Sequence, residues 1–187
     1  MGEVRGPWCG SLDFLLERGD GPGEDRLRAV EAEVDPSDPM LVAYSSGSTS
    51  DPKGAIHSHG TVVRHPHNLL PFRDFGPGDV LYSPMPVFWV GGLVFHLLCG
   101  LHAGATIVFE EAFEPGATLR LLEQERVTHV FGWPHVSTAL RAHPTFPDCD
   151  LSALRDSPGQ GLFPPPDGQW ERAQSLGMTE TLSLIHI

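Results

Sequence analysis

The chain has 187 residues, of which 40% are hydrophobic and 19% charged, so it is long enough to form one domain with its own core and does not resemble a disordered segment. Its formal net charge of −12 argues against nucleic acid and anionic membranes as partners, because both need a basic surface. The three cysteines are widely separated and odd in number, which argues against a disulfide framework or a paired-cysteine zinc site and favours a reducing cytoplasm.

The longest apolar run, residues 87–101, has 15 residues and contains a histidine and three glycines. A membrane-spanning helix needs about 20 apolar residues, so this run favours a buried helix. The first residues also lack the apolar core of a signal peptide. We therefore expect a cytoplasmic protein with no integral membrane segment.

The N-terminal part contains one predicted helix and one predicted strand. Ser11 is a candidate helix cap, and the apolar residues after it favour a helix to Arg18. Residues 35–39 contain two prolines and form a turn cluster. This turn leads into the short apolar run 41–44, which we predict to be a strand.

The rest of the chain alternates predicted strands and helices. Ser58 is a candidate cap for a helix that Pro66 should limit. Strands are expected at 80–83, 105–109 and 127–133, with helices between them at about 92–101, 115–125 and 134–142. This alternation of strands and helices predicts an α/β fold with a parallel sheet and flanking helices.

Residues 45–54 are rich in hydroxyl side chains and glycine and include one positive charge. This composition favours binding of a polyphosphate, because several donors on a flexible backbone can converge on anionic oxygens. Lys53 is the only lysine, and the other eleven of the twelve basic residues are arginine. Lysine is a common phosphate-binding residue. The alternative is a plain surface loop in which the lysine has no function.

The segment is not a P-loop. That motif needs glycine, four residues, and then Gly-Lys-Ser or Gly-Lys-Thr. Four residues after Gly47 the chain has Pro52, and Lys53 is followed by glycine. Proline also lacks the backbone N–H that a phosphate cradle would use there.

The segment instead resembles the Ser/Thr/Gly-rich signature of the adenylate-forming superfamily, which includes acyl-CoA synthetases and amino-acid adenylation domains. Residues 44–54 read Tyr-Ser-Ser-Gly-Ser-Thr-Ser-Asp-Pro-Lys-Gly, where the usual pattern is Tyr-Thr-Ser-Gly-Ser/Thr-Thr-Gly-x-Pro-Lys-Gly. The resemblance implies a partial N-terminal domain of such an enzyme. It also implies that ATP phosphates are bound by Ser45, Ser46, Gly47, Ser48, Thr49, Ser50 and Lys53.

Residues 84–92 are similar to the segment that lines the carboxylic-acid pocket in acyl-CoA synthetases. The resemblance implies that Trp89 and Gly91 bind the substrate, whereas a purely structural interpretation makes Phe88 and Trp89 a core aromatic pair. No acidic residue occurs between Met85 and Phe109, so a buried substrate amine would lack a countercharge. A fatty or aryl acid is therefore favoured over an amino acid.

A second segment, Leu-Gly-Met-Thr-Glu at 176–180, resembles the Tyr-Gly-x-Thr-Glu segment of the superfamily. The resemblance implies that Thr179 contacts a nucleotide phosphate and that Glu180 binds Mg²⁺, a cation that prefers carboxylate oxygens. Lys53, Thr179 and Glu180 are thus the expected catalytic residues. The adenine-binding turn expected near 157–161 matches poorly.

Four histidines, His57, His59, His65 and His67, form two His-x-His pairs. Imidazoles at alternate strand positions share a face and could bind a metal. No acidic or cysteine partner lies nearby in the sequence, and the superfamily has a similar histidine segment without a catalytic metal. A structural role is therefore favoured.

The resemblance implies that the complete enzyme converts an acid and ATP into an acyl-adenylate and then transfers the acyl group to coenzyme A. We expect residues 1–37 to be a lead-in segment, 38–181 a partial AMP-binding domain, and 182–187 a truncation tail. The fragment alone would be inactive, since the family's ribose-binding aspartate and C-terminal catalytic lysine are absent. The alternatives are a non-catalytic nucleotide-binding remnant, an unstable fragment and an amino-acid adenylation domain. The oligomeric state is not predicted.

Overall fold

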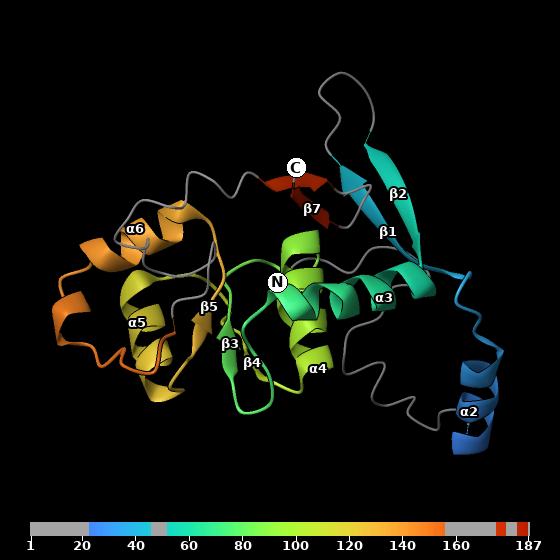
Figure 1. Cartoon of the computed structure of the whole chain (residues 1–187), viewed down its shortest axis with the longest axis horizontal. Helices are drawn as coiled ribbons and strands as arrows, with labels where there is room; N and C mark the ends of the chain where they lie inside the picture. The colour runs from blue at the N-terminus through green and yellow to red at the C-terminus, as the bar shows by residue number, and fades with distance from the viewer. Residues whose placement is uncertain (1–22, 46–51, 156–174, 179–182, 187) are drawn as a thin grey trace, which may run out of the picture. The chain divides into compact units, whose positions relative to one another are not determined.

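The computed structural model describes residues 23–45, 52–155, 175–178 and 183–186 (Figure 1). The chain divides into two compact units, residues 1–35 and 36–187. The first contains helix α2 (Glu24–Glu33), which buries none of its residues and carries an exposed ion pair between Arg28 and Glu24. The sequence did not predict this helix, because it lacks an apolar face. The helix predicted after Ser11 lies outside the described residues.

The second unit begins with an antiparallel hairpin of β1 (Pro39–Ser45) and β2 (Lys53–Ser58). The strand predicted at 41–44 is confirmed and is longer at both ends. Strand β2 was not predicted, because its residues alternate weakly between apolar and polar types. The hairpin brings the two ends of the segment that carries the phosphate-loop pattern together.

Helix α3 (His59–Leu69) follows directly and is capped as predicted, since the Ser58 hydroxyl accepts a hydrogen bond from the Thr61 backbone N–H. The expectation that Pro66 limits this helix is wrong. Pro66 lies inside the helix and is buried, so burial of its ring offsets the backbone hydrogen bond that proline cannot make. A short 3₁₀ helix, η1 (Leu70–Phe72), ends the segment.

A three-stranded parallel sheet forms the centre of this unit, which confirms the predicted α/β class. Its strands are β3 (Val80–Tyr82), β4 (Thr106–Val108) and β5 (His129–Val130), in the order β4-β3-β5. The connecting elements are the π-helix η2 (Gly91–Leu98), α4 (Cys99–Ala103), α5 (Pro115–Gln124), α6 (Pro134–Ala142) and η3 (Phe146–Asp148). Gly104 ends α4 in the left-handed conformation, with a φ of 69°, which glycine adopts without strain.

The two faces of the sheet pack against different helices. Tyr82 and Val130 belong to a cluster with residues of α5 and α6, such as Leu119 and Leu140. On α4, a Cβ at Gly100 would lie 2.8 Å from the Ile107 side chain, so helix and sheet approach closely there. Figure 1 shows α5 and α4 on either side of the strands. The helices therefore cover both faces and leave the strand ends for other uses.

A buried polar network joins β3 to α5. The Tyr82 hydroxyl donates a hydrogen bond to Glu110, and the Thr118 hydroxyl donates to the same carboxylate at 2.8 Å. Burial, followed by the hydrogen bond to Glu110, raises the pKa of Tyr82 far above its usual range. The hydroxyl therefore remains protonated and acts as a donor.

Two further strands, β6 (Ser175–Met178) and β7 (Ser183–His186), pair with each other in antiparallel register. Neither was predicted, and β7 falls within the segment expected to be a truncation tail. Among the described residues, no helix combines the length and apolarity required to cross a membrane.

Candidate functional site

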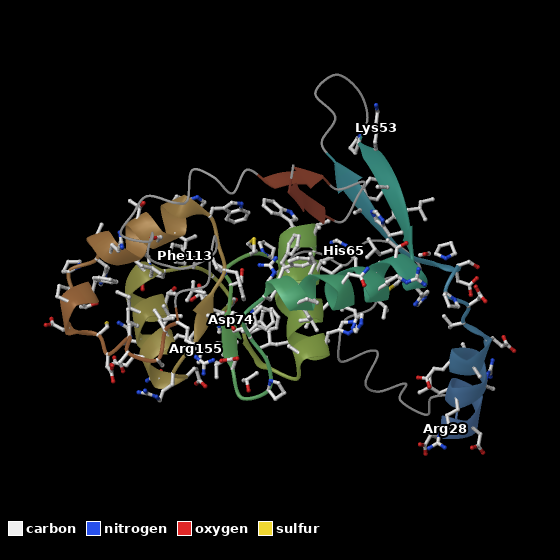
Figure 2. The ribbon with its side chains drawn as sticks, in the orientation of Figure 1. Arg28, Lys53, His65, Asp74, Phe113 and Arg155 are labelled. Carbon is white, nitrogen blue, oxygen red and sulfur yellow. The ribbon has the colours of Figure 1, made fainter. Side chains whose placement is uncertain are left out.

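The described ends of the phosphate-loop segment lie where β1 ends and β2 begins. Ser45 is the last residue of β1, and it pairs with Lys53, the first residue of β2. Residues 46–51, which include the predicted contacts Ser46, Gly47, Ser48, Thr49 and Ser50, lie outside the described residues. Lys53 is exposed, and Figure 2 shows its side chain extending away from the end of β2. The hairpin thus places the lysine charge at the base of the loop.

The strand order of the parallel sheet marks a second location. From the central strand β3 the chain moves to β4 on one side and then returns to β5 on the other. The direction in which the chain adds strands to the sheet therefore reverses, and β3 and β5 are the neighbouring strands on either side of that reversal. Open α/β sheets bind ligands outside the carboxyl ends of their strands at such a reversal.

Two tryptophans meet beyond the carboxyl ends of β3 and β5. Trp89 follows β3, Trp133 follows β5, and their ring centroids lie 5.6 Å apart in an edge-to-face arrangement. Trp133 also stacks on His135 at 5.5 Å, and Phe88 meets Trp89 at 6.0 Å. Trp89 is 52% exposed, Trp133 38% and Phe88 80%, so these aromatic rings form a surface and are not a core pair.

Gly91 and Gly92 allow the chain to pack tightly beside Trp89. A Cβ at Gly92 would lie 2.3 Å from the Pro86 carbonyl oxygen, whereas a Cβ at Gly91 would lie 2.7 Å from the Met85 sulfur. Helix η2 begins here as a π-helix, a form that occurs frequently at functional sites. The two glycines therefore fix the position of the backbone that follows Trp89.

The four histidines do not share one strand face. His57 lies in β2 and is buried, whereas His59, His65 and His67 lie in α3, where residues two apart point in different directions. The alternate strand positions that the metal-binding alternative requires are therefore not present for these two pairs. Among the residues that the structure describes, no group of three or more histidine, cysteine or acidic residues could hold a metal ion.

The second predicted motif is described only in part. Its first residues form β6, and Thr179 and Glu180 lie outside the described residues. Their assignments as phosphate-contacting and Mg²⁺-binding residues stay predictions.

Sequence reasoning missed two residues, Trp133 after β5 and Arg73 after η1. Trp133 precedes a helix-initiating proline and reads as the end of a strand, and Arg73 is one arginine among eleven. A tryptophan directly after an apolar strand, at a predicted strand-order reversal, is the signal that could have identified Trp133. No sequence signal distinguishes Arg73, because the rings that it contacts, Phe95 and Phe131, lie far from it along the chain.

The comparisons with known proteins agree with this architecture. The profile of the AMP-binding enzyme family matches residues 9–187. The chain belongs to the AMP-binding enzyme family. This confirms the predicted superfamily and its partial character, since the chain spans only about a quarter of the curated relatives that it matches.

Those AMP-binding relatives include several proteins named as CoA synthases or CoA ligases. Feruloyl-CoA synthase from Amycolatopsis sp is 41% identical over 118 residues, which cover 63% of this chain and 24% of that protein. Indoleacetate--CoA ligase from Aromatoleum aromaticum is 36% identical over 146 residues, which cover 78% of this chain and 28% of that protein.

Solved structures confirm the fold as that of an AMP-binding N-terminal domain. The inhibitor-bound N-terminal domain of FACL13 from Mycobacterium tuberculosis has a TM-score of 0.62 and 27% identity, covering 66% of this chain and 31% of that chain. A Mycobacterium tuberculosis fatty acyl CoA synthetase has a TM-score of 0.64 and 26% identity, covering 76% and 27%. The mixed sheet and helix architecture is therefore that of this domain.

Proposed function

We propose that this chain is part of an acid–CoA ligase that activates an aryl acid. In the first step a carboxylate oxygen attacks the α-phosphate of ATP, which gives an acyl-adenylate and releases pyrophosphate. In the second step the coenzyme A thiol attacks the acyl carbon, which forms the thioester and releases AMP. The reaction takes place in the cytoplasm, which agrees with the absence of a disulfide pattern in the sequence.

The observation that carries this proposal is the contact between Trp89 and Trp133 at the strand-order reversal. Two exposed indole rings 5.6 Å apart present flat apolar faces and edges to which an aromatic ring can pack. No acidic residue lies between Met85 and Phe109, so the same segment offers nothing to an ammonium group. An aryl acid fits this surface better than an amino acid does.

The relatives support the same substrate class. The names of three of them refer to feruloyl, indoleacetate and 4-coumarate groups, each of which contains an aromatic ring. The first two relatives share 41% and 36% identity with this chain. Fatty acids remain the alternative substrate class that the test must include.

The hairpin supplies the proposed ATP phosphate site. Lys53 at the base of the loop would add a point charge, and the loop residues Ser45, Ser46, Gly47, Ser48, Thr49 and Ser50 would donate hydrogen bonds to the β- and γ-phosphates. Such donors stabilise the pyrophosphate that leaves. Thr179 would add a further contact, and Glu180 would hold Mg²⁺, which neutralises phosphate charge when bound.

The test is pyrophosphate release by the full-length protein in the presence of ATP, Mg²⁺, and a panel of aryl and fatty acids. We expect release with aryl acids and a clear loss of kcat/KM in Trp89→Ala. Leu101→Ala is the matched control, because Leu101 is 62% exposed and lies on α4, which leads into the amino end of β4. Absence of release with every acid would reject the ligase assignment, and a preference for fatty acids would reject the aryl assignment.

A further inference from the structure

Arg73 is a half-buried arginine that lies against two aromatic rings. Its guanidinium carbon is 5.3 Å from the centroid of the Phe95 ring and 5.9 Å from that of Phe131. Cation–π contacts of this kind stabilise a charge that has been removed from water. Burial lowers the pKa of Arg73 from its ordinary value, which reflects the cost of keeping this cation away from solvent.

No carboxylate neutralises this cation within the part of the chain that the structure describes. The ion pairs found there involve Arg28, Arg126, Arg155 and His129, and none includes Arg73. The neighbouring Cys99 thiol does not serve as a counterion, because burial raises its pKa to about 11. The described residues around Arg73 therefore hold a positive charge and supply no matching negative one.

A second polar group near Arg73 also lacks a partner. The Nε2 atom of His65, on α3, is buried and makes no hydrogen bond to the described residues (Figure 2). Burial, and then the charge of Arg73, lower the pKa of His65, so its imidazole stays neutral near pH 7. A neutral imidazole can donate one hydrogen bond through Nε2.

The rings that hold Arg73 connect it to the candidate acid site. Phe131 is the first residue after β5, and its backbone N–H donates to the Tyr82 carbonyl at the carboxyl end of β3. Trp133 follows two residues later. Phe95 lies in η2, the helix that begins directly after Trp89 and Val90. Arg73 thus contacts one aromatic ring from each of the two segments that carry the tryptophans.

We infer that Arg73 is a specificity-determining residue, and that it binds a second anionic group on the tail of the acid substrate. This inference rests on the proposed function above and names the substrate class more closely, as an aryl acid that carries a second carboxylate. A guanidinium suits this role because its planar set of N–H donors matches a carboxylate in a bidentate arrangement. A monocarboxylic aryl acid would leave the buried charge unpaired.

The test compares three probes by calorimetric titration of the 187-residue chain: benzoate, 4-methylbenzoate and terephthalate. The methyl probe matches the dicarboxylate in having a substituent at the same ring position. We expect terephthalate to bind roughly tenfold more tightly than 4-methylbenzoate, as one charge-assisted hydrogen-bonded pair can supply. Arg73→Met should remove this preference, and Arg73→Lys should keep part of it.

Arg64→Met is the matched control, because Arg64 is exposed on α3, and it should leave the preference unchanged. The ratio of the two affinities is read within each variant, so a general loss of folding cannot imitate the result. Equal binding of the methyl and carboxylate probes by the wild-type chain would overturn the role of Arg73 while leaving the acid site in place. Failure of all three probes to bind would overturn the aryl-acid site itself.

Discussion

The Asp79 carboxylate lies 3.0 Å from the guanidinium of Arg155, and it joins the start of β3 to a residue 76 positions later in the chain. The Asp79 side chain is only 6% exposed, and its other oxygen accepts a hydrogen bond from the Gly76 backbone N–H at 2.8 Å. Arg155 also donates its backbone N–H to the Thr128 carbonyl beside β5. The pair therefore holds Arg155, where the described range 52–155 ends, at the amino ends of the strands.

We expect Asp79→Asn to lower the free energy of unfolding by about 1–3 kcal/mol, because a buried group loses its charge-assisted partner. Urea unfolding followed by circular dichroism measures this change. Asp150→Asn is the control: its pair with Arg126 is longer, at 3.5 Å, and both side chains are more than half exposed, so the expected change is below about 0.5 kcal/mol. Equal effects of the two substitutions would show that burial does not strengthen the first pair.

Stability should fall as the pH decreases from about 7.5 to 5.5, and His96 should contribute to this fall. His96 is fully buried; Nε2 is 3.1 Å from the Leu81 carbonyl oxygen, and Nδ1 has no partner among the described residues. Burial lowers the pKa of His96 below its ordinary value, so the unfolded chain binds a proton that the folded chain does not. The contribution of His96 to the free energy of unfolding is therefore fully present above the pKa that this histidine has in the unfolded chain. It is lost below that pKa, at up to about 1.4 kcal/mol per pH unit for one proton.

The measurement is the free energy of unfolding at several pH values for the wild type and for His96→Leu. The variant should have a shallower pH dependence whatever its absolute stability. His102→Leu is the control, since His102 is exposed on α4. An unchanged slope in His96→Leu would assign the pH dependence to the other buried histidines.

Alanine substitutions at three glycines should form a graded series. Gly92→Ala places a Cβ 2.3 Å from a backbone oxygen that cannot move away, so we expect a loss of about 1–3 kcal/mol or more. Gly91→Ala meets only the flexible end of Met85 and should cost less. Gly76→Ala meets nothing within 4 Å and serves as the control. Thermal unfolding ranks the three, and a different order would mean that the η2 backbone is not constrained as described.

Lys53→Ala should weaken binding of ATP with Mg²⁺ by about tenfold, because loss of one charge contact to phosphate costs about 1.4 kcal/mol. The unfolding temperature should not change, since Lys53 is exposed. Calorimetric titration measures the affinity, and Arg64→Ala is an exposed basic control. Identical affinities of the wild type and Lys53→Ala would exclude the phosphate role of the hairpin loop.

Local signals in the sequence identified several elements correctly. Pro115 begins α5 as expected, and Glu114 caps it by accepting hydrogen bonds from the Gly116 and Ala117 N–H groups. Ser58 likewise caps α3. The helix start at Pro115 and the Ser58 cap were predictable because each depends on residues only a few positions apart, whereas the Glu114 cap was not predicted. Pro66 was misjudged because its effect on α3 depends on burial, which is a property of the folded chain.

The strands also differ in which of their features depend on nearby residues and which depend on the folded chain. The apolar runs at 80–83, 105–109 and 127–133 predicted three parallel strands, and three are present, but β5 contains only two residues. The length of a strand depends on how many backbone groups find a partner on the neighbouring strand, which a single run does not specify. Strand β2 was missed for a related reason, since pairing with β1 stabilises a segment whose own pattern is weak.

The sequence by itself determined the family, the hydroxyl-rich segment with its single lysine, and the order of the α/β elements, because each depends on residues that are neighbours along the chain. Only the tertiary structure revealed that Ser45 pairs with Lys53 and that Trp89 meets Trp133 beyond the strand ends. It also showed that Arg73 lies between Phe95 and Phe131. These relationships join distant segments, and strand pairing and the packing of side chains at the sheet edge decide them.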